Sequence, residues 1–133
     1  VMHAMKDRPD FAMLVGPEEI TGECVLLGGH GGINGGANMF PELYVGMYNA
    51  AKAGNLAEVR RLQQYIMQIS SSIYTVGKYG SSYLKGLKCA LSILGIINDD
   101  FVASPFYKFQ EPEREKIRQA LESLPIKNGK LIF

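Results

Sequence analysis

A run of glycines in the first third of this 133-residue chain limits its possible folds more than any other feature. Residues 28–38 read GGHGGINGGAN and contain six of the fifteen glycines. Glycine adopts backbone angles that other residues avoid and leaves space for a close approach, but it weakens regular structure. We interpret the run as a strand end in a functional site that a ligand approaches. The alternative is a tight strand-to-helix crossing without a ligand.

The residues before this run predict a short α/β segment. Residues 11–15 read FAMLV, and five apolar residues without alternation are typical of a strand that is covered on both faces, as in parallel sheets. Gly16 is expected to end this strand. Pro17 suits the first position of a helix, and the two glutamates after it would lie in the first turn, where the helix dipole favours negative charge. A second, brief strand is predicted at residues 31–34, where Ile33 is the only bulky apolar residue.

From residue 40 onward the hydrophobic period is that of helices. Apolar residues recur three or four positions apart, and the clearest stripe covers about five helical turns between Leu56 and Val76. Asn55 and Glu58 have the spacing of a capping box at the start of that helix. Residues 127–133 are expected to form a short tail. The helices predicted in this part run from Pro41 to Gly54, from Leu56 to Val76, from Leu84 to Gly95 and from Glu111 to Leu124.

This order of elements is incomplete for a parallel sheet. The end of a helix at residues 1–7, a strand, a helix and a second strand, followed by helices alone, indicate part of a repeating β/α architecture. Two strands leave both sheet edges unpaired, and the FAMLV strand would have nothing to cover it. A (β/α)8 barrel takes about 250 residues. We therefore predict the last quarter of such a barrel with a helical appendage, a chain that does not fold by itself.

Composition excludes several classes of partner. Fourteen Lys and Arg residues stand against thirteen Asp and Glu, and this net charge of +1 gives no electrostatic basis for binding nucleic acid or an anionic membrane. No apolar run approaches the ~20 residues that cross a bilayer. Cys24 and Cys89 are expected to be reduced, buried thiols of a cytoplasmic protein, without a disulfide or a metal site. The four tyrosines between residues 65 and 83 are interpreted as helix-face or interface aromatics.

Several of these motifs occur together in one family. Residues 11–38, with a strand that ends at Gly16, two acids just after it and GGHGGINGGAN further on, resemble strands seven and eight of the dihydrodipicolinate synthase and N-acetylneuraminate lyase family. The segments AAKAGN (50–55), LKCALSILG (87–95) and SPFY (104–107) are similar to the three-helix C-terminal part of these enzymes. The resemblance covers nearly the whole chain.

The resemblance implies a fold class and a division of the chain. The expected fold is α/β: the C-terminal part, strands seven and eight, of a (β/α)8 TIM barrel with a C-terminal helical extension. Residues 1–39 would form the last two β/α units, and residues 40–133 the final barrel helix and the extension. The family also implies a homotetramer, in which the remaining N-terminal part of the barrel completes this chain.

The resemblance further implies class I aldolase chemistry. In this family a lysine on strand six forms a Schiff base with pyruvate or another 2-oxo acid, and a tyrosine after strand five moves the proton. Neither belongs to the matched segment. We therefore expect no catalytic residue, cofactor or metal in this chain, and a lysine at the end of the strand before Val1. Lys85 and Lys88 are expected to be solvated or packed on a helix, because a Schiff-base lysine needs a desolvated pocket.

Three residues after the first strand match the substrate-binding wall of the family. Gly16 corresponds to a glycine whose bare backbone lets the substrate approach. Glu18 and Glu19 correspond to an acidic pair that accepts hydrogen bonds from substrate hydroxyls in the sugar-acid lyases. The alternative for these acids is that they stabilise the helix dipole without touching a ligand.

The second strand contributes three more predicted substrate-binding residues. Ile33 matches the residue whose main-chain carbonyl lies beside the Schiff-base nitrogen, and Asn34 and Gly35 follow it. Gly35 occupies the place of a serine in sialic acid lyases, which argues against sialic acid itself as the substrate. His30, in the same run, is expected to be a structural hydrogen-bonding residue, because the spacing fixes no partner carboxylate.

The predicted function is a Schiff-base-forming lyase, aldolase or synthase that acts on pyruvate or another 2-oxo acid, with this chain as one wall of the active site. Dihydrodipicolinate synthase proper, which condenses pyruvate with aspartate semialdehyde, is an alternative. Two further alternatives are a non-catalytic barrel fragment and a nucleotide-binding module. The sequence disfavours the last, because GHGGIN lacks the third glycine of G-x-G-x-x-G and no Gly-Lys-Ser/Thr follows.

Overall fold

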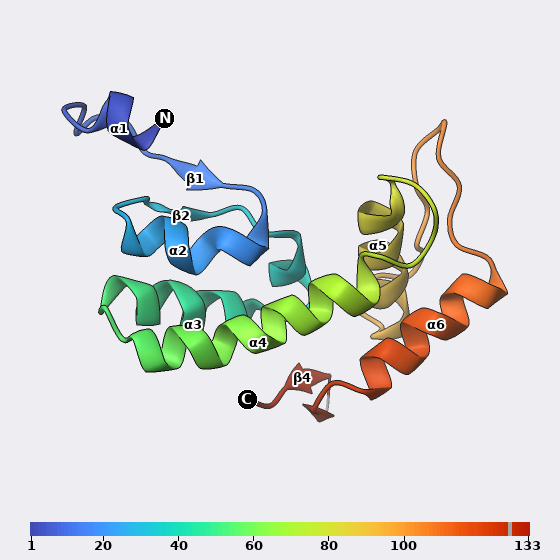
Figure 1. Ribbon diagram of the computed structural model, residues 1–133. Helices are drawn as coiled ribbons and strands as arrows, with labels where there is room; N and C mark the ends of the chain where they lie inside the picture. Colours follow the sequence, from blue (N-terminus) through green and yellow to red (C-terminus); the bar gives the residue numbers. More distant parts are fainter. Residues whose placement is uncertain (128) are drawn as a thin grey trace.

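The computed structural model describes residues 1–127 and 129–133 and is mostly helical (Figure 1). Two short strand pairs lie near its ends: a parallel one in the N-terminal part and an antiparallel one at the C-terminus. The elements in chain order are α1 (Met2–Met5), β1 (Leu14–Val15), the 3₁₀ turn η1 (Glu18–Ile20), α2 (Thr21–Leu26), β2 (Gly31–Gly32), the 3₁₀ turn η2 (Gly35–Asn38), α3 (Pro41–Lys52), α4 (Leu56–Ile73), α5 (Ser82–Ile93), α6 (Glu111–Glu122), β3 (Ile126–Lys127) and β4 (Lys130–Leu131).

The N-terminal part is a β-α-β unit. β1 and β2 pair in parallel, with Leu14 opposite Gly31, and α2 connects them. The predicted burial of residues 11–15 is wrong within this chain: Leu14 is 49% exposed, and the strand extends over two residues only. A lone strand pair has both edges unpaired and gives its apolar side chains few residues to pack against, so apolar residues of β1 stay in contact with solvent.

The entry into the first helix also differs from the prediction. Pro17 does not open an α-helix; it precedes η1, and α2 begins three residues after that turn starts, at Thr21. The two predicted glutamates therefore lie in a tight 3₁₀ turn, where the side chains of consecutive residues point in different directions. The turn faces the helices that follow, and this orientation gives each carboxylate its own partners.

The helical part encloses one hydrophobic core. In Figure 1, α2, α3 and α4 lie one beneath the other, while α5 and α6 pack across the C-terminal end of α4. The stripe predicted between residues 56 and 76 is confirmed at its centre. Leu56 at its start, in the first turn of α4, is 51% exposed. The fully buried apolar residues of α3 and α4 are Leu43, Met47, Leu62, Ile66, Ile69 and Ile73.

The start of α4 carries the predicted cap. The side chain of Asn55 accepts a hydrogen bond from the backbone N–H of Glu58 at 3.2 Å. The reciprocal half of the capping box is absent from the described hydrogen bonds, since the Glu58 carboxylate instead binds the guanidinium of Arg61 at 2.6 and 2.8 Å. This salt bridge lies on the solvent side of α4 and contributes little stability.

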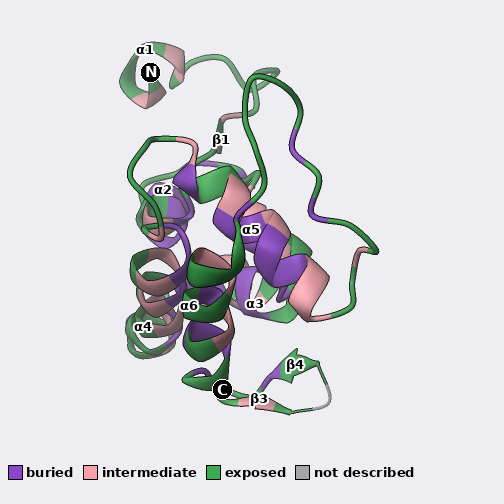
Figure 2. Ribbon diagram, turned by 90° about the vertical axis from the view of Figure 1, so that its right-hand side faces the viewer, coloured by how far each residue is buried: buried purple, intermediate pink, exposed green. Residues whose placement is uncertain are grey.

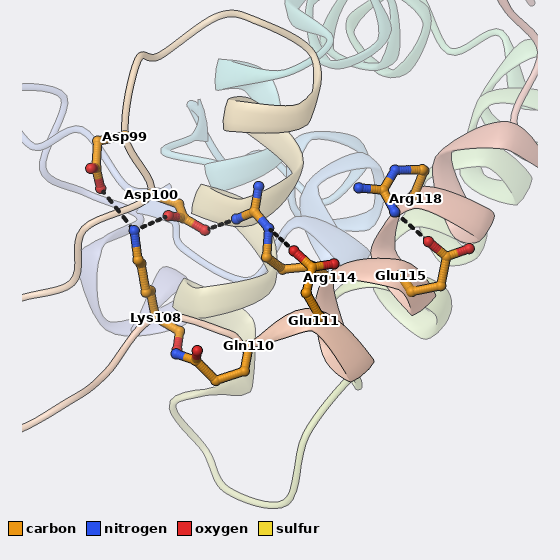
Figure 3. A network of polar contacts seen from close by, with 8 residues as sticks. All are labelled: Asp99, Asp100, Lys108, Gln110, Glu111, Arg114, Glu115 and Arg118. Carbon is orange, nitrogen blue, oxygen red and sulfur yellow. Dashed lines mark hydrogen bonds and ion pairs between the residues drawn. The ribbon is translucent and has the colours of Figure 1, made fainter.

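The segment between α5 and α6 is mostly exposed, as Figure 2 shows, and an ionic network fastens it to α6 (Figure 3). Asp100 is 3% exposed and binds the guanidinium of Arg114 on α6 and, at 3.5 Å, the ammonium of Lys108. Removing one partner would leave a buried charge without compensation. The network therefore fixes the path of this loop, together with the buried side chains of Val102 and Phe109.

Of the remaining predictions for this part, some are confirmed and others are not. Cys24 and Cys89 are free and buried, as expected, and burial raises the pKa of the Cys89 thiol to about 11. The helix predicted from Leu84 begins two residues earlier, at Ser82, and Leu84 itself is 37% exposed. The tail contains a hairpin of β3 and β4, with Ile126 opposite Leu131 and Leu131 buried against the core. The proposed division at residue 40 stays a prediction.

Candidate functional site

A hollow of about 400 Å³ lies at the carboxyl ends of β1 and β2. In barrels built of parallel strands, this end of the sheet carries the active site. Four of the six predicted substrate-binding residues line the hollow. The other two lining residues are a proline next to Gly16 and a tyrosine on α5. The lining residues are Gly16, Pro17, Glu18, Glu19, Ile33 and Tyr83.

Gly16 presents open backbone to the hollow. A Cβ atom built at this position would have no other atom within 4 Å, so the glycine is not required for packing within the described chain. Its carbonyl oxygen accepts a hydrogen bond from the side-chain amide of Asn34 at 3.3 Å. These observations agree with the predicted bare wall, and the substrate approach at Gly16 stays a prediction.

The Glu18 carboxylate is the polar centre of the site and is 2% exposed. One oxygen accepts the backbone N–H of Gly36 at 2.8 Å, and the other accepts the hydroxyls of Tyr44 at 2.5 Å and Tyr74 at 2.9 Å. Three donors, from η2, from α3 and from the residue that follows α4, thus converge on one side chain of η1. The substrate contact predicted for Glu18 stays a prediction, and its side chain already holds four elements together.

The two tyrosines that bind Glu18 remain protonated over the physiological range. Burial, followed by the negative charge of Glu18, raises the pKa of Tyr44 well above the ordinary value for a phenol. Burial also raises the pKa of Tyr74 strongly, with the neighbouring Tyr44 and Glu18 adding to the effect. Both hydroxyls therefore act as permanent donors to the carboxylate.

Glu19 is half-buried and points toward α4. Its carboxylate accepts a short hydrogen bond from the Ser70 hydroxyl, and its backbone carbonyl accepts one from the Gln63 side chain at 2.6 Å. The other carboxylate oxygen has no partner among the described hydrogen bonds, and Glu19 is one of the residues that line the hollow. Glu19 is thus the less saturated of the two acids.

The residues of the second strand lie at the other side of the hollow. The backbone N–H of Ile33 donates to the carbonyl of Val15 at 2.8 Å and extends the strand pairing by one step, while its side chain is 73% exposed. The Asn34 side chain accepts from the Thr21 hydroxyl at 3.1 Å and donates to Gly16. Asn34 therefore links the ends of the two strands, and its predicted substrate contact remains untested.

In the second half of the glycine run, the glycines allow tyrosine side chains of this chain to pack closely against the backbone. A Cβ atom at Gly35 would overlap the hydroxyl of Tyr83, and one at Gly36 would overlap the hydroxyl of Tyr44. Gly31 has a φ of +144°, which L side chains rarely adopt. Close approach is thus required as predicted, but at positions 35 and 36 the approaching groups are tyrosines of this chain.

His30 has the structural role that the sequence suggests. Its imidazole Nδ1 accepts a hydrogen bond from the backbone N–H of Met13 at 3.0 Å. The backbone N–H of His30 donates to the carbonyl of Met13 at 2.8 Å. Lys85 and Lys88 also behave as expected. The Lys85 ammonium lies 5.6 Å from the ring centroid of Phe109, and the Lys88 ammonium donates to the carbonyl of Phe101 at 2.6 Å, so both hold the loop after α5.

Tyr83 is the site residue that sequence reasoning missed. It lies on α5, is 40% exposed, and its hydroxyl sits against Gly35. Burial, with the charges of Glu18 and Glu19, raises the pKa of its hydroxyl, so the group is a donor at neutral pH. No spacing rule connects a helical tyrosine with a strand end so far upstream. An excess of tyrosines on one helical stretch was the available signal.

Within residues 1–127 and 129–133, no group of three His, Cys, Asp or Glu side chains could hold a metal ion. The same residues contain no helix with the length and apolar character of a membrane span. Every buried side-chain nitrogen or oxygen among them has a hydrogen-bond partner. The polar chemistry of the described chain is therefore concentrated in the hollow and in the Asp100 network.

A model of the Dihydrodipicolinate synthetase family matches residues 1–124. The chain belongs to this family. Its resemblance to strands and helices of that family, read from the motifs, is thereby confirmed. Among curated relatives, it is 28% identical to a probable 2-dehydro-3-deoxy-D-pentonate aldolase of Escherichia coli K12 over 86% of this chain and 36% of that protein. It is also 28% identical to 4-hydroxy-tetrahydrodipicolinate synthase of Methanopyrus kandleri, over 93% and 40%.

Solved structures give the same result. Dihydrodipicolinate synthase from Bacteroides thetaiotaomicron is 70% identical and superposes with a TM-score of 0.89, over 93% of this chain and 41% of that one. The sialic acid aldolase of Ruminococcus gnavus, in a catalytic lysine mutant, matches at 21% identity and a TM-score of 0.71, over 89% and 38%, which shows the fold alone. These neighbours are TIM-barrel enzymes, and the chain spans about two fifths of the relatives it matches.

Proposed function

We propose that this chain is the part carrying strands seven and eight of a (β/α)8 lyase, and that it forms one wall of a site for pyruvate or another 2-oxo acid. The observation that carries the proposal is the hollow at the carboxyl ends of β1 and β2, where open backbone at Gly16 meets the acid-rich turn η1. Family membership and the coverage of about two fifths of the relatives support it.

The exposed apolar surface of the β-α-β unit supports a continuing barrel. A second hollow of about 330 Å³, between α1, β1 and α2, is lined mainly by apolar side chains. Large apolar residues around β1, among them Phe11 and Leu14, are more than 40% exposed. Contiguous surface of this kind marks a place where other protein packs. In the proposal, the remaining N-terminal part of the barrel covers it, and the complete enzyme is a cytoplasmic homotetramer.

In this mechanism the chain binds and orients, while covalent chemistry belongs to a lysine outside it. The lysine amine attacks the carbonyl carbon of the 2-oxo acid, and loss of water gives the Schiff base. Ile33 and Gly16 offer main-chain groups on either side of the reacting carbon. Glu19 and Tyr83 face the part of the substrate beyond it, so binding there fixes the orientation in which the carbon–carbon bond forms or breaks.

Dihydrodipicolinate synthase proper is the second candidate, because the 70% identical structure carries that name. This activity requires an active-site wall that accepts an amino-acid aldehyde. The relative from E. coli is instead named for a sugar-acid substrate. The nucleotide-binding alternative receives no support from the geometry, since tyrosine hydroxyls occupy the space beside Gly35 and Gly36. The non-catalytic alternative is an outcome of the experiment below.

The test is a chimera in which the N-terminal part of the Bacteroides thetaiotaomicron protein, up to the start of the match, is fused to Val1. We expect pyruvate and borohydride to give a reduced covalent adduct on the chimera, detected by intact mass. The N-terminal part alone should give none, and neither should the 133-residue chain, although it contains Lys85 and Lys88. An adduct on the isolated chain, or equal trapping with and without it, would contradict the proposal.

A further inference from the structure

We infer that the segment between α5 and α6, residues 96–110, packs its exposed aromatic side chains against the N-terminal part of the same polypeptide. This segment is called the docking loop below. The inference rests on the proposed function, because that proposal supplies the N-terminal part. It gives the helical extension a second task, which is to hold on to the rest of the barrel at the carboxyl-end side of the sheet.

The docking loop carries three large aromatic side chains that the described chain leaves in solvent. Phe101 is 67% exposed, Phe106 45% and Tyr107 80%. A single exposed apolar residue is ordinary, but three on one loop concentrate apolar surface, and aromatic residues are enriched where proteins contact one another. This loop therefore has the composition of an interface.

Ionic and polar contacts hold the docking loop in one orientation (Figure 3). Near its start, the buried Asp100 binds the guanidinium of Arg114 on α6, and the ammonium of Lys108, near the end of the loop, lies 3.5 Å from the same carboxylate. The Lys88 ammonium on α5 donates to the carbonyl of Phe101 at 2.6 Å. The two arms of the loop are thus tied to one another and to both flanking helices.

Buried neighbours fix the direction in which the aromatic side chains point. Asp100 and Val102 are 3% and 4% exposed, whereas Phe101 between them lies in solvent. This alternation is that of an extended chain, in which successive side chains point to opposite sides. Further along, Phe109 anchors the second arm in the core. A surface that is fixed before it meets its partner loses little entropy on binding.

The position of the docking loop favours the N-terminal part as its partner. In Figures 1 and 2 the loop rises on the side of the helical core where α1 and β1 lie, and in Figure 1 the arrow of β1 points toward it. Within the described chain the strand pair has two unpaired edges, from which the further strands of the proposed barrel continue. Their carboxyl ends, and the loops that follow them, come out on the side of the docking loop.

The size of the aromatic surface argues against a separate molecule as the partner. Interfaces between separate proteins bury about 1,600 Å² in all, far more than three side chains on a loop supply. A segment of the same polypeptide acts at a high effective concentration, so a small surface is sufficient. This chain covers 41% of the 70% identical structure, so more than half of that protein lies outside the match. The corresponding N-terminal part is the partner to which we assign the loop.

The first experiment measures the accessibility of Tyr107 in the chimera that forms the borohydride adduct. Tetranitromethane nitrates accessible tyrosine rings, and peptide mass spectrometry gives the rate at Tyr107. The reference is the same chimera unfolded in urea. We expect nitration of Tyr107 to be at least about ten-fold slower in the folded chimera, because a covered ring reacts only in the fraction of molecules that has opened locally. Without such a cover the ring would react readily, since it is 80% exposed in the described chain.

The second experiment asks whether the contact contributes stability to the chimera. Phe101→Ser and Tyr107→Ser should each lower the melting temperature by about 3 °C, because each removes a buried aromatic contact. Leu56→Ser is the matched control and should change it little: Leu56 is 51% exposed, and the first turn of α4 lies at the end of the helical part away from α5 (Figure 1). Sedimentation equilibrium should give the molar mass of the parent for all three variants.

Nitration of Tyr107 at the same rate in the folded and the unfolded chimera would overturn the inference. So would melting temperatures of Phe101→Ser and Tyr107→Ser equal to that of Leu56→Ser. A smaller oligomer in the Tyr107→Ser variant would assign the loop to a second copy of the chain and overturn the stated partner. Each of these results is obtained on a chimera that still forms the borohydride adduct, so they differ from failure of the proposed function, in which no adduct forms.

Discussion

The β-α-β unit (residues 11–38) and the helical part (residues 40–133) differ in how far their apolar side chains are buried. In α3 and α4, the central apolar residues are fully buried against other elements of the same chain. In the β-α-β unit, Leu14 and Ile33 are 49% and 73% exposed. Apolar residues thus make a closed core in one region and leave an exposed surface in the other. The difference teaches that the helical part buries its apolar residues within the described chain, while the strand pair leaves its own apolar residues exposed, as the proposed barrel requires.

The largest expected effect contrasts two core-type substitutions in the chimera and in the isolated chain. The closed helical core leads us to expect that the isolated chain folds, against the sequence prediction that it does not. Ile66→Ala should lower the free energy of unfolding by about 4 kcal/mol in both, because it leaves a cavity in a core that this chain closes itself. Leu14→Ala should cost less than about 1 kcal/mol in the isolated chain and clearly more in the chimera. Urea denaturation measures both. Equal costs of Leu14→Ala in the two contexts would break the contrast between the regions.

A second prediction concerns Glu18, the side chain that joins the two regions. Glu18→Ala should destabilise the chain by about 3 kcal/mol, because the N–H of Gly36 and the hydroxyls of Tyr44 and Tyr74 lose their acceptor in a buried place. Glu23→Ala, at an exposed acid on α2, is the matched control and should change stability little. Thermal unfolding distinguishes the two, and similar melting temperatures would show that Glu18 does not hold the regions together.

A smaller effect is expected at alkaline pH. The folded-state pKa values of Tyr44 and Tyr74 lie above the ordinary value near 10, chiefly because both are buried, so between these values the folded chain holds protons that the unfolded chain has released. Stability is therefore fully present below about pH 10 and falls above it, by about 1.4 kcal/mol per pH unit for each tyrosine. Denaturation between pH 8 and 11 measures this slope. Tyr44→Phe should reduce it, and Tyr107→Phe, at a residue 80% exposed, should not.

Much of the fold could be predicted from the sequence because its signals are local. Pro41 at the start of α3, the Asn55 cap and the apolar period at the centre of α4 act within one or two helical turns, and the structure confirms each, whereas Pro17 does not open a helix. Local patterns failed where an outcome depended on distant chain segments. The exposure of Leu14 and the 3₁₀ turn at Glu18 reflect which elements pack nearby, and no spacing in the sequence encodes that.

The features of the candidate site can likewise be separated into those that the sequence predicted and those that depend on distant chain segments. By itself the sequence determined where the backbone carries no side chain, because the glycines can be read from it directly. The glycines and the acids after Gly16 also belong to the motifs that identify the family. Tertiary structure alone decided what fills the space: Tyr44, Tyr74 and Tyr83 reach the strand ends from three helices, and two of them bind a carboxylate 26 and 56 residues away. Such contacts depend on helix packing angles and on side-chain direction, which arise only when the whole core assembles.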